Sequence, residues 1–314
     1  MKAIIITLLP ILAFLVAFCS RCGGEIRFSE EADFITVFEN EKPVLRYVRG
    51  EVLPPGAPEK MRRSTYVHPI YSIDGVPLTD DGPQDHYHHR GLSWMWSKVT
   101  FNGVTRNLWS LVDIHQHYRS HTTTLRPDGR AVLSVRNVWQ EDETGREVIR
   151  EQVTLTVHPA FETGRFIDAE IILAAVDTPV NLRVSDVGYG GFTLRFAPRA
   201  ETVITTSKGP ITKDIERYRV AWADLSGRFQ NDDRWDGIAI FENRSNPHFP
   251  TGWTLRFYGL LNPALGSTLP EGYTIEISKP LTLRYRLLVH KGKIDDITLF
   301  RLFNNYNQNL NELL

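Results

Sequence analysis

The chain has 314 residues, of which 42% are hydrophobic and 11% aromatic, and its 36 basic and 37 acidic residues leave a formal net charge of −1. This composition is sufficient for one sizeable hydrophobic core. The balanced charge, without any run of five like charges, argues against nucleic acid as a partner and favours a neutral or mildly charged small molecule or glycan.

The first 22 residues have the pattern of a secretory signal peptide. Lys2 precedes sixteen residues without a charge, 3–18, a run that is marginal for a membrane span of about 20 apolar residues. We therefore expect export to the periplasm or the outside of the cell, with any membrane contact made through the signal peptide or a lipid anchor. Cys19 is the candidate lipidation site because Leu15-Val16-Ala17 precede it, although Phe18 is large for the residue before a cleavage site. Simple secretion, lipid anchoring and a retained anchor all stay open.

The remaining chain, 23–314, is expected to form a single domain without cysteine chemistry. The sequence has two cysteines, Cys19 and Cys22, and both belong to the N-terminal segment. A disulfide framework, a thiolate nucleophile and a cysteine metal site are therefore excluded from this domain.

Apolar and polar residues alternate with a period of two along much of the chain, as in half-buried antiparallel strands. The pattern predicts strands at 34–39, 44–49, 93–101, 131–139, 148–158, 166–176, 180–185, 192–196, 201–206, 219–224, 237–242, 253–257 and 281–289. The one predicted helix is C-terminal, at 294–314, where Asp295 and Asp296 suit a helix N-terminus. Many short strands without β-α-β spacing predict an all-β fold, a large antiparallel β-sandwich (supersandwich-like) with a short C-terminal helical tail.

The densest polar cluster is the segment Gln84-Asp85-His86-Tyr87-His88-His89-Arg90-Gly91. Imidazole suits general acid–base work because its ordinary pKa lies near neutral pH, and a neighbouring carboxylate can fix its tautomer. We therefore take His86, His88 and His89 as candidate catalytic groups, with Asp85 as their orienting carboxylate. The alternative is a structural role, in which these histidines hydrogen-bond the backbone at the end of a sheet.

The histidine spacing also leaves a metal site open. His86 and His88, and likewise His115 and His117, have the two-residue spacing that can chelate a metal from one strand face, and His121 follows. If a divalent metal is bound, these two pairs are its candidate ligands. Otherwise no cofactor is expected, and the second pair belongs to a solvated polar stretch.

Several further residues are candidates for substrate binding. They are Arg90, His117, Arg195, Asn246 and Arg256. Arginine can hold a sugar hydroxyl or the carboxylate of a uronate. Trp94, Trp96 and Trp109 follow the histidines closely, and they are expected in the core unless one stacks on a sugar ring.

The chain resembles the PmoA-like family of bacterial proteins, most of them of unknown function, over about residues 34–303. The resemblance is carried by Tyr66-Val67-His68-Pro69-Ile70-Tyr71, Gly75-Val76-Pro77-Leu78-Thr79-Asp80, Asp85-His86-Tyr87-His88-His89-Arg90-Gly91 (the family usually has proline at position 87), Gly190-Gly191-Phe192, Arg195, Trp222-Ala223-Asp224, Asn246-Pro247, Trp253, Arg256-Phe257-Tyr258-Gly259, Arg284-Tyr285-Arg286 and His290. The family name points to methane oxidation, but a subunit of a membrane-bound methane oxygenase would need several long apolar spans, and this sequence has none. The resemblance implies a secreted or lipid-anchored β-sandwich protein in a polysaccharide setting.

The sequence thus predicts an extracytoplasmic carbohydrate-active protein that uses histidine acid–base chemistry, of the lyase or epimerase type. Two alternatives remain, a non-catalytic glycan-binding protein and a metal-dependent oxygenase or hydrolase. Whether the protein is an enzyme at all is left open by the sequence, as are its substrate and its oligomeric state.

Overall fold

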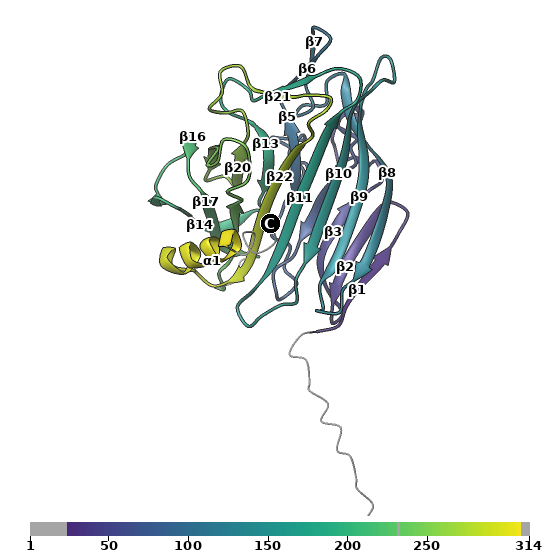
Figure 1. Ribbon diagram of the computed structural model, residues 1–314. Coiled ribbons are helices and arrows are strands. Elements are labelled where there is room, and N and C mark those ends of the chain that lie inside the picture. Colours follow the sequence, from purple (N-terminus) through teal and green to yellow (C-terminus); the bar gives the residue numbers. More distant parts are fainter. Residues whose placement is uncertain (1–23, 231–232, 309–314) are drawn as a thin grey trace, which may run out of the picture.

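The computed structural model describes residues 24–230 and 233–308, and it is built from antiparallel strands with one C-terminal helix (Figure 1). The predicted signal peptide and Cys19 lie outside the described residues, so both stay predictions. No helix within the described ranges has the length and apolar character needed to cross a membrane.

Two nine-stranded sheets and one four-stranded sheet make up the fold. The first sheet has the order β1 (Ile26–Glu30), β2 (Phe34–Glu39), β3 (Lys42–Val48), β4 (Tyr66–Ile70), β5 (Leu92–Trp96), β13 (Gly190–Arg195), β20 (Leu260–Ala264), β19 (Gly252–Arg256) and β16 (Ile215–Arg219). The second has the order β15 (Gly209–Ile211), β14 (Arg199–Thr206), β17 (Trp222–Phe229), β18 (Asp236–Glu242), β22 (Leu281–Lys291), β11 (Gly164–Ala175), β10 (Glu147–Val157), β9 (Ala131–Glu141) and β8 (Ile114–Leu125). The third has the order β21 (Tyr273–Ile275), β12 (Val180–Arg183), β6 (Lys98–Phe101) and β7 (Val104–Arg106), and a single 3-10 turn, η1, spans Glu59–Met61.

The two large sheets pack face to face, as the alternating strands require. Across the interface Trp96 of β5 meets Trp139 of β9 with 5.9 Å between ring centroids, and Phe192 of β13 stacks on Tyr285 of β22 at 4.1 Å. These rings belong to one continuous buried core that draws on all three sheets. The predicted β-sandwich is therefore confirmed.

One polar network is enclosed in this core. The carboxylate of Glu151 accepts hydrogen bonds from Gln116 Nε2 (3.0 Å), Asn137 Nδ2 (2.7 Å) and Trp139 Nε1 (2.7 Å). Burial raises the pKa of Glu151, and these donors offset only part of that effect. The Arg63 guanidinium, also buried, donates to Gln116, and burial lowers its pKa to about 9.

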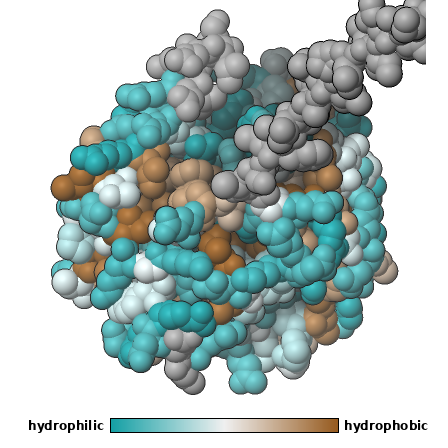
Figure 2. Space-filling view, turned by 90° about the horizontal axis from the view of Figure 1, so that it is seen from below, coloured by the Kyte–Doolittle hydropathy of each residue, from teal (hydrophilic) through white to brown (hydrophobic). Residues whose placement is uncertain are grey.

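Helix α1 (Asp296–Gln308) covers the outer face of the second sheet beside β17, β18 and β22. Asp295 caps its N-terminus, since its Oδ1 accepts a hydrogen bond from Thr298 N at 2.8 Å. Leu299, Phe303 and Tyr306 form a second buried cluster with Trp222 and Phe241, among others. Elsewhere hydrophilic side chains dominate the surface, as Figure 2 shows for the face seen from below, where apolar patches lie between them.

Candidate functional site

The segment Gly82–Gly91, between β4 and β5, forms tight turns rather than the extended strand in which histidines would alternate between faces. His86 N donates to Pro83 O at 2.8 Å, and His89 N donates to His86 O at 2.9 Å. Gly91, with a φ of +42°, ends the segment, and a β-carbon there would lie 2.2 Å from Val67 O. The chain can therefore enter β5 this closely only with glycine at this position.

These turns bring the imidazoles of His86, His88 and His89 together, and we call them the histidine cluster. The ring centroids of His86 and His89 are stacked at 4.6 Å, those of His88 and His89 lie 4.5 Å apart, and those of His86 and His88 lie 5.7 Å apart. His89 is buried, whereas the side chain of His86 is 35% exposed. The cluster therefore reaches the protein surface through His86 and the half-buried His88.

An aromatic wall of Trp109, Tyr189 and Tyr258 borders the histidine cluster. Trp109 lies 6.0 Å from His88 and 5.6 Å from His89, and it stacks on Tyr189 at 5.5 Å. Tyr258 stacks on His86 at 5.6 Å and remains 38% exposed. Trp109 is buried, so Tyr258 is the ring of this wall best placed to stack on a sugar ring at the surface.

Two predicted arginines lie against this wall. The guanidinium carbon of Arg195 sits 4.6 Å from the ring centroid of Tyr258, and Arg256 Nε donates to the Tyr189 hydroxyl at 2.9 Å. Arg256 also pairs with Glu216, whereas Arg195 pairs with Asp80, whose carboxylate lies 3.9 Å from its Nε. The side chain of Arg195 is 8% exposed, and its buried Nε and Nη1 atoms make no hydrogen bond within the described residues. Unmet donors on a buried cation are costly, which favours a ligand or water at this place.

Two of the three histidines have strongly lowered pKa values. Burial, reinforced by the neighbouring imidazoles and Arg195, lowers the pKa of His88 to about 4 and that of His89 to about 2, so both are neutral at pH 7. His86 Nδ1 lies 2.9 Å from Asp85 Oδ2. Partial burial raises the pKa of Asp85, but His86 and the charge of Arg195 outweigh it, and the pKa is lowered. The site thus combines a carboxylate–imidazole pair with two neutral imidazoles.

Three predicted binding residues are not brought to this site. Arg90 is fully buried, ion-paired with Asp81, and hydrogen-bonded to Met61 O and Val52 O. Asn246 joins two segments of the fold, because Arg284 N donates to its Oδ1 (2.7 Å) and its Nδ2 donates to Arg284 O (2.9 Å). Such fully used polar groups support the fold.

His117, the third, lies on β8 with His115, whereas His86 and His88, the other two histidines of the proposed metal set, lie in the segment Gly82–Gly91. His117 Nδ1 is 3.2 Å from Glu51 Oε1, and His115 Nδ1 is 2.7 Å from Asp142 Oδ1. Both histidines line a separate cavity of ≈ 290 Å³ with Glu51 and Arg62. Nowhere in the described ranges do three or more histidine, cysteine, aspartate or glutamate side chains lie where they could hold a metal. The four-histidine metal set is therefore not assembled.

The sequence reasoning missed Tyr189 and Tyr258 as site residues. Tyr258 lies two residues after the end of β19, and Tyr189 immediately precedes β13. A large aromatic residue just outside a strand was the sequence signal that could have identified both tyrosines as site residues, since the hydrophobic core does not require an aromatic side chain at such a position.

Comparison with known proteins gives a family without a known activity. No curated protein matches the chain. Among solved structures, the fold is similar to the GH36 α-galactosidase AgaB from Geobacillus stearothermophilus, with a TM-score of 0.39 and 9% sequence identity over 86% of this chain. The chain spans 40% of that enzyme's length, and a likeness this distant says nothing about activity. The resemblance to PmoA-like proteins stays a prediction. Residues 35–304 match the model of the family of unknown function DUF6807, and the chain belongs to that family.

Proposed function

We propose that the protein binds a sugar at the histidine cluster and acts on it by acid–base chemistry. The observation that carries the proposal is the convergence of three imidazoles, the aromatic wall and the Arg195 guanidinium at one place, which His86 and Tyr258 open to solvent. The buried Nε and Nη1 of Arg195 make no hydrogen bond within the described residues. Aromatic faces and polar donors arranged together are what a sugar ring requires of its site.

In this proposal the Asp85–His86 pair moves the proton. A carboxylate beside an imidazole holds its orientation and stabilises the imidazolium that forms when the ring takes a proton. His88, neutral at pH 7, is suited to donate or accept a hydrogen bond without changing its charge. Removal of a proton from a sugar carbon and return of a proton to the opposite face corresponds to an epimerase. Removal of that proton with expulsion of the neighbouring β-oxygen substituent, which leaves protonated as an alcohol, corresponds to a lyase.

The substrate-binding role falls to Arg195 and the aromatic wall. Arg195 can place its unmet N–H groups on a hydroxyl or carboxylate oxygen of the sugar, and Arg256 holds the Tyr189 ring through its hydroxyl. The export of the protein, predicted from its first 22 residues, is part of this proposal because it would bring the site to extracellular polysaccharide.

The test is turnover of an oligosaccharide panel, read by mass spectrometry, with matched histidine variants. We expect His86→Gln to lower turnover by about 10²- to 10⁴-fold with binding retained, the usual contribution of a general acid or base. His115→Gln is the control, because His115 also pairs with an aspartate but lies outside the cluster. Turnover that survives both His86→Gln and His88→Gln would contradict the proposed chemistry.

One observation favours a second function, non-catalytic glycan binding. The low pKa values of His88 and His89 make both rings weak bases. If this function is correct, oligosaccharides bind and are never converted, and Tyr258→Ala abolishes binding. The same panel, followed by calorimetry, separates the two functions.

A further inference from the structure

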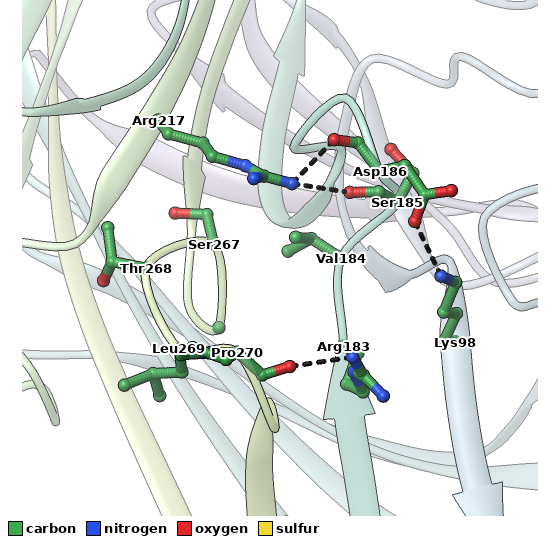
Figure 3. Close-up of a pocket in the computed structure, with 11 residues that line it drawn as sticks. Lys98, Arg183, Val184, Ser185, Asp186, Arg217, Ser267, Thr268, Leu269 and Pro270 are labelled. Atoms are coloured by element: carbon green, nitrogen blue, oxygen red, sulfur yellow. Dashed lines mark hydrogen bonds and ion pairs between the residues drawn. The ribbon is translucent and has the colours of Figure 1, made fainter.

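A polar cavity of ≈ 390 Å³ is bordered by the 185–186 turn (Figure 3). Ser185 and Asp186 line the cavity, whereas Tyr189, further along the chain, stacks on Trp109. The remaining lining comes from Lys98 of β6, Arg183 of β12, Arg217 of β16 and the loop 266–270. The cavity volume falls within the range of small-ligand sites.

Three cations surround this cavity and one carboxylate faces them. Lys98 Nζ lies 2.8 Å from Asp186 Oδ1, and this contact, with the nearby charges of Arg217 and Arg183, lowers the pKa of Asp186. The cavity lining therefore carries a formal charge of +2, three cations minus one carboxylate.

The two arginines are held by neutral groups. Arg217 Nη2 donates to the backbone oxygens of Asp186 (2.7 Å) and Ser185 (3.3 Å), and Arg183 Nη2 donates to Pro270 O at 2.7 Å. Figure 3 shows Arg217 reaching across to the 185–186 turn while Arg183 lies beside Pro270 on the other side. Carbonyl contacts orient a guanidinium without neutralising it, so both arginines retain charge for an anion.

We infer that this cavity binds an anionic group, a carboxylate or a sulfate or phosphate ester, carried by a small polar ligand. The fork of each guanidinium matches two oxygens of such a group. Asp186, ion-paired with Lys98 and influenced by the charges of Arg217 and Arg183, competes with the ligand for this positive charge. The inference does not depend on the proposed acid–base chemistry, which uses other residues.

The competition by Asp186 gives a test in which two substitutions act in opposite directions. Binding is measured by isothermal titration calorimetry at low ionic strength with inorganic sulfate, glucuronate and, as the neutral counterpart, glucose. We expect Arg183→Gln to weaken anion binding at least about tenfold, because a charge-assisted contact is lost. Asp186→Asn should tighten it, because the competing carboxylate is removed. Asp186 is 94% exposed, so this change leaves the packing intact.

Arg150→Gln is the matched control. Arg150 is 70% exposed, belongs to the second sheet, and lies 3.7 Å from Glu147. We expect this substitution to leave anion binding unchanged. Tighter binding of glucuronate than of sulfate identifies a sugar acid, and equal binding identifies the anionic group alone. Binding of glucose as strong as that of glucuronate, or equal anion affinity in Asp186→Asn and Arg183→Gln, would overturn the inference.

Discussion

Glu242, at the end of β18, is a carboxyl group enclosed in the core, and it gives a sharp test of the electrostatics of this fold. Its side chain is inaccessible to solvent, and Oε2 accepts hydrogen bonds from Thr251 N (3.0 Å) and Thr251 Oγ1 (3.2 Å). Oε1 makes no hydrogen bond within the described part of the chain. Burial raises the pKa of Glu242 from 4.5 to about 7, and the contacts with Thr251 offset only part of that increase.

This raised pKa makes the protein less stable as the pH rises. Between pH 4.5 and 7 the unfolded chain releases the Glu242 proton while the native state keeps it. Ionisation therefore lowers the free energy of the unfolded state but not that of the native state. A difference of about 2.5 pKa units corresponds to about 3 kcal/mol at roughly 1.4 kcal/mol per unit. The penalty is absent below pH 4.5 and complete above pH 7.

Glu242→Gln removes the titration and keeps the shape of the side chain. We expect the variant to gain up to about 3 kcal/mol of unfolding free energy over the wild type at pH 8, and close to nothing at pH 4.5. Urea denaturation at both pH values measures this difference, with the exposed Glu162→Gln as the control. An equal effect of Glu242→Gln at the two pH values would refute the reasoning.

Three other outcomes can be measured on the same protein. Asp81→Asn leaves the buried Arg90 guanidinium without a carboxylate, and it should cost about 3–5 kcal/mol in urea denaturation. Phe303→Ala removes a buried ring of α1 and should cost about 3–5 kcal/mol, whereas Phe300→Ala, 54% exposed on the same helix, should cost far less by the same assay. Burial lowers the pKa of His290, but the Asp224 carboxylate, 2.9 Å from its Nε2, has the larger effect, and the pKa is raised from 6.5. An NMR titration should therefore find the His290 ring still protonated above pH 6.5. The stability that this proton contributes should be complete below pH 6.5 and decline as the pH rises through the raised pKa.

Strands with one face in the core were predictable from the sequence, because burial imposes the period of two. The predictions at 34–39, 131–139 and 281–289 correspond closely to β2, β9 and β22. The expected strand at 219–224 was wrong, since β16 ends at Arg219 and β17 begins at Trp222. The break itself, Val220-Ala221, is apolar and is followed by Trp222, so alternation alone could not reveal where one strand ends and the next begins.

The strand β8 was missed because its sequence, Ile-His-Gln-His-Tyr-Arg-Ser-His, is polar on both faces. It lies at the edge of the second sheet, where one neighbour is absent and polar residues cost little. The C-terminal helix was predicted at 294–314, and the structure describes it at Asp296–Gln308.

The composition of the site was partly predictable and its assembly was not. The density of histidines identified the loop, and Arg195 and Arg256 were named as binding residues. Arg90 looked equivalent to them, because the sequence alone does not distinguish an arginine that supports the fold from an arginine that binds a ligand. Arg90 is held by the Asp81 carboxylate beside it, whereas the buried Nε and Nη1 of Arg195 make no hydrogen bond within the described residues, and only the fold determines this difference.

The carboxylate of Glu151, with its ring of donors between the sheets, also constrains how the strands can pair during folding. A shift of β10 by one residue would turn Glu151 to solvent and bring Arg150 or Gln152 inward, where the donors that bind the Glu151 carboxylate would lose their anionic acceptor. In a purely aliphatic core the same register shift would cost less free energy, since one apolar side chain can take the place of another. Glu151 therefore favours a single register of β10 in the sheet.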